Sequence, residues 1–144
     1  MRARIVSCIL IALTGCTGAT GPDRLRVLGE IKGYNSGDPQ ILIVLQEGRR
    51  VDVSVTTYGG GCHSQGETEV DIQGLTVTVT PYDYTALPGT GCTRQLVAFT
   101  HRAFVQFRNS GTARVRVRGL DAGNRSAGNL LGDTLVVEQV VEVR

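Results

Sequence analysis

The sequence lacks several features that would assign it to a familiar class of protein. It contains no tryptophan, so the core Trp of antibody-type domains is missing. Its one N-terminal apolar run, residues 5–13, is far shorter than the roughly 20 apolar residues that a membrane-spanning helix needs. After that run no segment shows the 3.6-residue apolar period of an amphipathic helix. The composition therefore argues against a membrane-spanning protein and against a helical domain.

An excess of charge of one sign is also missing. The chain has 15 Lys and Arg residues against 13 Asp and Glu residues. Two of the basic residues, Arg2 and Arg4, precede the N-terminal apolar run, and without them the basic count falls to 13. No overall field attracts a polyanion, so we expect no nucleic-acid partner.

The start of the chain has the pattern of a secretory signal peptide, with a basic start, a short apolar core and small residues before a cleavage site. Its last four residues are Leu13, Thr14, Gly15 and Cys16. This tetrapeptide resembles the lipobox of bacterial lipoproteins. The resemblance implies that the Cys16 thiol is diacylglycerated, that cleavage occurs just before it, and that the new amino terminus is acylated. An ordinary signal peptide that leaves a spare thiol at Cys16 is the alternative.

The resemblance divides the chain into three parts: a signal peptide at 1–15, a lipidated tether at 16–23, and one domain at 24–144. It implies a protein of the cell envelope that is anchored outside the cytoplasm by its lipid. In that family an Asp directly after the Cys commonly retains the protein at the inner membrane. Thr17 stands there instead, so we expect the outer membrane where the organism has one.

Only two cysteines remain in the expected domain, because Cys8 lies in the signal peptide and Cys16 is the lipidation site. Disulfides persist outside the cytoplasm, so we predict a bond between Cys62 and Cys92. Two free thiols or a pair of metal ligands remain the alternatives.

The domain shows two-residue alternation of β-branched and polar residues, with turn signals between short segments. Residues 41–45 form a continuous apolar run, which predicts a strand covered on both faces and paired with 51–56. Residues 81–91, rich in Pro and Gly, predict a loop. The expected core consists of Val53, Val55, Val77, Val79, Val115 and Val117. The other expected strands are 24–31, 68–72, 75–80, 92–99, 102–108, 113–119 and 135–143.

About seven to nine such strands predict an all-β domain, an antiparallel β-sandwich that resembles immunoglobulin domains in architecture only. A partly closed β-barrel is the alternative. The spacing of Cys62 and Cys92 is much shorter than that of the bridge in antibody domains.

Candidate chemistry is weak throughout. Cys62, His63, Cys92 and His101 offer sulfur and nitrogen to a metal, but no C-x₂-C pair is present. The residue types of a Ser–His–Asp catalytic triad are present at Ser64, His101 and Asp83, but the G-x-S-x-G motif around a nucleophilic serine is missing. We therefore expect no enzyme, no metal and no cofactor. Other patterns considered are an Asx-rich loop that could bind calcium (Asp121, Asn124, Asn129, Asp133) and a basic strand face (Arg114, Arg116, Arg118).

The surface that the sequence favours for recognition lies in the segments around the predicted disulfide, where tyrosines accompany glycine-rich loops. Packing of these tyrosines over the disulfide is the competing interpretation. Together the patterns predict a non-enzymatic binding or structural module of the envelope, held at the membrane by its lipid, with a possible envelope protein as partner. An inhibitor or accessory subunit of an envelope enzyme or assembly is the alternative. The candidate surface consists of Tyr58, His63, Tyr82, Asp83 and Tyr84.

Overall fold

The computed structural model describes residues 24–32, 40–45, 48–124 and 133–144 of the chain. The expected signal peptide and tether, with Cys16, lie outside these residues, as does Asn129. The described part contains nine strands and one short 3₁₀ turn, so the predicted all-β class is confirmed. The elements are β1 Arg24–Leu28, β2 Glu30–Lys32, β3 Ile41–Leu45, β4 Arg50–Gly59, β5 Ser64–Gln73, β6 Thr76–Ala86, β7 Val97–Gln106, β8 Gly111–Asp121, η1 Ala122–Asn124 and β9 Asp133–Val143.

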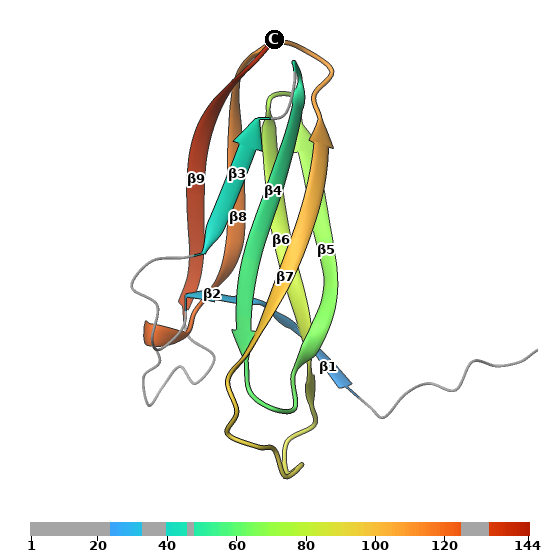
Figure 1. Ribbon diagram of the computed structural model, residues 1–144, viewed down its shortest axis with the longest axis vertical. Helices are drawn as coiled ribbons and strands as arrows, with labels where there is room; N and C mark the ends of the chain where they lie inside the picture. The colour runs from blue at the N-terminus through green and yellow to red at the C-terminus, as the bar shows by residue number, and fades with distance from the viewer. Residues whose placement is uncertain (1–23, 33–39, 46–47, 125–132) are drawn as a thin grey trace, which may run out of the picture.

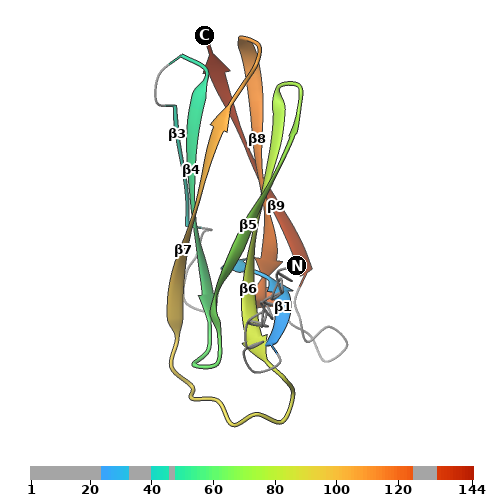
Figure 2. The ribbon, with the colours of Figure 1, turned by 90° about the vertical axis from the view of Figure 1, so that its right-hand side faces the viewer.

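The long strands form two layers that face each other (Figures 1 and 2). Strands β3, β4 and β7 make one layer, which we call the β4 layer, and all its pairings are antiparallel. Strands β5, β6, β8 and β9 make the other, the β8 layer, in which β6 and β8 pair in parallel. The hydrogen-bonded sheet is not closed into a barrel and is consistent with the expected β-sandwich.

Strands β1 and β2 connect the two layers. β1 pairs antiparallel with β6 in the β8 layer, whereas β2 pairs with β8 on one side and with β4 on the other. The crossing occurs at Gly29, whose N–H donates to Pro81 O at 2.9 Å and whose carbonyl accepts from Leu120 N at 2.9 Å. A Cβ at Gly29 would lie 2.5 Å from Thr57 Cγ2, so only glycine fits this close approach.

The core lies between the layers and is built mostly from valine. All six predicted core valines are at most 2% exposed, as the alternation of apolar and polar residues requires. Phe107 and Ile31 add the largest apolar side chains, and Val143 closes the far end of β9. The inward faces of both layers are thus apolar along most of their length.

Several expected boundaries are wrong. The expected single strand 24–31 is divided at Gly29 into β1 and β2, which pair with different strands. β6 continues through Pro81 to Ala86, where a loop was predicted, because Pro81 lies beside a register shift between Gln65 and Thr68 that interrupts the ladder. The expected strands 92–99 and 102–108 are replaced by the single strand β7, and 92–96 lies outside any strand. The polar stretch around His101 does not break β7, because His101 points into the interior and finds polar partners there.

Candidate functional site

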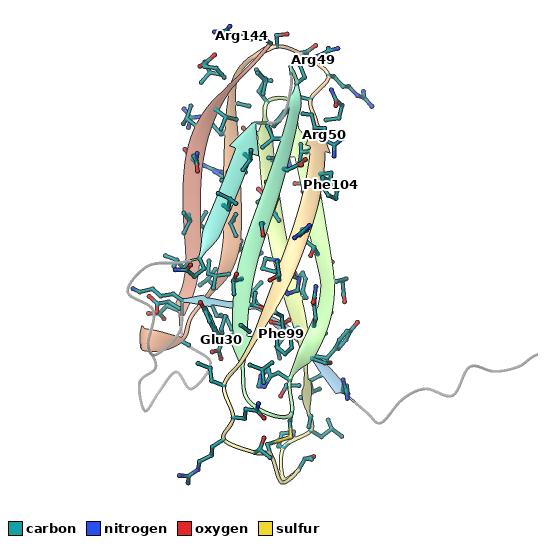
Figure 3. All side chains as sticks on the ribbon, in the orientation of Figure 1. Glu30, Arg49, Arg50, Phe99, Phe104 and Arg144 are labelled. Atoms are coloured by element: carbon teal, nitrogen blue, oxygen red, sulfur yellow. A yellow bond between two sulfur atoms is a disulfide. The ribbon has the colours of Figure 1, made fainter. Side chains whose placement is uncertain are left out.

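The disulfide Cys62–Cys92 is present and joins the β4–β5 hairpin to the segment between β6 and β7 (Figure 3). Gly61 N donates to Thr93 O at 3.2 Å beside it. A Cβ at Gly61 would lie 1.7 Å from Thr93 Oγ1, so the glycine permits the close contact. None of the three consecutive glycines here has a positive φ. They serve close approach and not a left-handed turn.

The candidate tyrosine surface is divided by the fold. Tyr82 and Tyr84 lie on the outer face of the β8 layer, where β1 pairs beside them. Tyr58 alternates with the inward-facing Val55 and Thr57 and therefore lies on the outer face of the opposite layer. Asp83, expected at the surface, is only 1% exposed, because it alternates with outward-facing Tyr82 and Tyr84. These residues do not form one recognition surface.

His63 stays at the hairpin tip. Its Nδ1 accepts a hydrogen bond from Gly60 N at 3.0 Å, and its backbone N–H donates to Gly60 O at 2.9 Å. A Cβ at Gly59 would lie 2.5 Å from the His63 ring. The histidine therefore packs onto the hairpin and shapes the loop.

Tyr82 and Tyr84 belong to a network that Arg26 organises. The Arg26 guanidinium stacks 3.4 Å from the centre of the Tyr82 ring and is paired with Glu67 and Glu69. The Tyr84 hydroxyl donates to Glu67 Oε2 at 2.8 Å. That hydrogen bond raises the pKa of Tyr84 and, with the charge of Arg26, lowers the pKa of Glu67. Both tyrosines are thus engaged with neighbours on their own sheet face.

A buried polar cluster spans the two layers and centres on His101. His101 Nε2 lies 3.1 Å from Asp83 Oδ1 and 3.2 Å from Thr57 Oγ1, while His101 Nδ1 lies 3.0 Å from Thr68 Oγ1. Thr57 and His101 come from the β4 layer, and Thr68 and Asp83 from the β8 layer. Asp83 Oδ2 is enclosed without a hydrogen-bond partner in the described part of the chain.

Of the three residues considered as a catalytic triad, the structure brings His101 and Asp83 together but leaves Ser64 apart from them. Ser64 pairs with Tyr84 on the outer face, and its hydroxyl accepts a hydrogen bond from Arg24 Nη1 at 2.5 Å. His101 is 1% exposed, so a substrate cannot reach its ring. The arrangement is suited to tying β5 and β6 to β4 and β7. Alternation could have revealed it, because Thr57, Asp83 and His101 fall at inward positions of their strands.

A second site, absent from the sequence interpretation, lies on the outer face of the β4 layer. Residues that pair across β3, β4 and β7 form two neighbouring rows on this face, and their side chains line a shallow hollow. Leu42 is 61% and Phe104 62% exposed, so the run 41–45 is not covered on both faces as expected. No described strand covers β3 from outside, and its apolar residues reach solvent. The rows are Leu42–Ser54–Arg102 and Val44–Asp52–Phe104.

Charged side chains border this hollow. The Arg50 guanidinium lies 5.1 Å from the centre of the Phe104 ring, and Arg50 Nε contacts Asp52 Oδ1 at 3.2 Å (Figure 3). Arg102 is exposed at the opposite side. Exposed aromatic and arginine side chains beside aliphatic ones are the composition that protein-binding centres favour.

The basic strand face and the Asx-rich loop that the sequence analysis considered form ion pairs and hydrogen bonds within the domain. In the arginine row of β8, Arg116 Nε lies 2.7 Å and Arg114 Nη1 3.7 Å from Glu138 on β9. Asp121 Oδ2 pairs with Lys32 Nζ at 3.1 Å, and its Oδ1 accepts from Gly123 N at 3.0 Å. Within the described residues, no three His, Cys, Asp or Glu side chains converge in a way that suits a metal ion.

Comparisons with protein-family models, with curated proteins and with solved structures found no match. Among the described residues no helix has the length and apolar character needed to cross a membrane.

Proposed function

We propose that the protein is a bacterial lipoprotein whose β-sandwich is a non-enzymatic binding or structural module, anchored in the cell envelope outside the cytoplasm. Leu13-Thr14-Gly15-Cys16, at the end of a short apolar run, is the observation that carries the proposal. The disulfide supports it, because such bonds persist in oxidising compartments. Thr17 favours the outer membrane where the cell has one.

The geometry of the polar cluster supports a non-enzymatic role. His101 and Asp83 are the residues with the chemistry of an acid–base pair, yet both are at most 1% exposed. General acid–base catalysis requires hydrogen-bond reach to a reacting atom. A pair that is buried between the two layers contributes to folding instead.

An inhibitor or accessory subunit is the second candidate, and the outer face of the β4 layer favours it. Leu42, Val44 and Phe104 offer apolar area, while Arg102 offers a donor for a carboxylate. The fitting partner is an envelope protein with an apolar surface and an acidic residue at its rim.

Acyl labelling in cells tests the anchor. Cys16→Ser should abolish incorporation of labelled lipid and release the protein from the membrane fraction. Cys8→Ser is the matched control, because it makes the same change inside the expected signal peptide and should leave both readouts intact. Membrane-bound protein without label in the wild type would contradict the proposal.

Site-specific photo-crosslinking in cells tests the binding face. A photoreactive residue at Phe104 should give one product of defined mass with an envelope protein. The same residue at Thr78, on the outer face of the β8 layer, should not. Equal products at both positions would argue against a partner on the β4 layer.

A further inference from the structure

The end of the domain that carries the disulfide is also the end at which the chain continues toward Cys16. Arg24, the first residue of β1, pairs with Ala86, the last residue of β6. The segment that follows Ala86 contains Cys92 and the disulfide. Eight residues lead from Cys16 to Arg24. Even fully extended they span at most roughly 28 Å, so a lipid on Cys16 holds this end close to the bilayer.

Three leucines are exposed at this end. Leu25 is 44%, Leu87 40% and Leu96 55% exposed. The opposite end carries Arg49 and Arg144, which Figure 3 shows far from the disulfide, and the exposed aliphatic side chains toward it include Ile72 at 46% and Val140 at 54%. The end with the three leucines is the one nearer the anchor.

Acidic residues are absent from the two segments that the disulfide joins. Residues 60–66 and 87–96 contain no Asp or Glu. Arg94 is exposed between Cys92 and Leu96. The tether has one carboxylate, Asp23, and the nearest acid of the adjoining sheet, Glu67, is engaged by Arg26 and Tyr84. A surface with leucines and arginine and few carboxylates suits the boundary of a bilayer with anionic headgroups.

The backbone that carries these leucines is constrained. The disulfide fixes Cys92 to the β4–β5 hairpin. In the segment that leads from β6 to Cys92, Thr90 N donates a hydrogen bond to Leu87 O at 3.2 Å and closes a turn. A surface that is already ordered loses little conformational freedom when it binds.

We propose that this end, defined by Leu25, Leu87, Arg94 and Leu96, is a membrane-contact surface. Its leucines enter the interfacial region of the bilayer and its arginine meets lipid phosphates. The contact holds the sandwich upright, with the end that carries Arg49 and Arg144 directed away from the membrane. The inference rests on the proposed lipid anchor, which brings this end to the bilayer.

The absence of tryptophan makes a direct test possible. Full-length lipidated Leu96→Trp and Leu87→Trp variants are reconstituted into phosphatidylethanolamine–phosphatidylglycerol vesicles, with either ordinary or brominated acyl chains. Bromine quenches only tryptophans that reach the lipid, so both variants should lose most of their emission in brominated vesicles. Leu42→Trp is the matched control, because Leu42 is 61% exposed but lies on the outer face of the β4 layer. Its emission should stay unchanged.

The outcomes separate this inference from the anchor. A variant that carries labelled lipid and floats with vesicles, but emits equally in both vesicle types at positions 87 and 96, contradicts the membrane-contact surface and leaves the anchor intact. Equal quenching at position 42 also contradicts it, because the domain would then lie on its side. A wild-type protein without lipid on Cys16 overturns both proposals.

Discussion

Asp83 on β6 and His101 on β7 meet across the two layers, with Oδ1 of the one 3.1 Å from Nε2 of the other and both side chains at most 2% exposed. The second carboxylate oxygen, Asp83 Oδ2, has no partner among the described residues. His101 also lies within hydrogen-bond distance of Thr57 and Thr68, whereas Asp83 depends on His101 for its side-chain hydrogen bond among the described residues.

Removing one member of this pair should destabilise the domain strongly. His101→Ala leaves Asp83 enclosed without its partner, and we expect a loss of about 3 kcal/mol or more. Replacing both residues with Leu removes the polar groups together and should cost less than the single change. Chemical denaturation measures each free energy of unfolding. Asp52→Asn, at an exposed ion pair, is the control and should stay within about 0.5 kcal/mol.

The disulfide should stabilise the domain because it reduces the conformational entropy of the unfolded chain. It links residues 30 positions apart, and a loop of that size corresponds to about 3–4 kcal/mol. Mass spectrometry of the native protein should find no free thiol at Cys62 or Cys92 until a reductant is added. A Cys62→Ser, Cys92→Ser double variant should unfold at lower denaturant concentration, whereas two thiols that titrate in the unreduced wild type would contradict the bond.

Substitutions on the two faces of one strand should differ sharply. Val115→Asp puts a carboxylate at a position that is 0% exposed, and the domain should unfold or lose several kcal/mol. Arg116→Asp, one position along β8, changes an exposed side chain; it loses the contact with Glu138 and sets a carboxylate opposite that residue, which should cost about 1 kcal/mol at most. Circular dichroism of the purified pair compares them. A similar loss in both would mean that the face assignment is wrong.

The Arg26 network should affect stability in acid. The hydrogen bond from Tyr84 and the charge of Arg26 lower the pKa of Glu67 from its ordinary 4.5. A carboxylate whose pKa is lower in the folded state stabilises that state above the unfolded pKa, and the contribution is lost as the pH falls through the folded pKa. NMR titration should show the Glu67 midpoint below 4.5 in the wild type. Tyr84→Phe should move it upward, while Tyr58→Phe, on the other layer, should not.

The sequence predicted what depends on local alternation. The core valines and the pairing of 41–45 with 51–56 follow from spacing along short segments, whereas the disulfide was predicted because only two cysteines remain in the expected domain. Asp83 continues the alternation of Val77 and Val79, but the Pro and Gly residues of 81–91 predicted a loop there, and Asp83 was therefore expected at the surface. The buried position is acceptable only because His101, from a strand of the other layer, supplies a partner. That partnership depends on long-range packing, which a single sequence does not reveal.

The division of the candidate surface has a similar cause. Tyr58 and Tyr82 lie in segments that a disulfide brings together, yet each follows the pleat of its own strand to a different outer face. Leu42 and Val44 were expected to be buried and are exposed. A continuous apolar run does not show whether a neighbouring layer covers the second face of its strand. Both features depend on layer order, and β2 with its partners β8 and β4 determines that order.

The place of β2 between β8 and β4 also determines when the domain can finish folding. Glu30 pairs with Tyr58 and with Leu120, so one neighbour is synthesised soon after β2 and the other only after most of the chain. Contacts of such sequence separation form slowly, because a long loop must close first. β2 therefore cannot complete its pairing until β8 has been synthesised. We expect folding to be completed only after β8 has been made, with the β2–β8 rungs among the last to form.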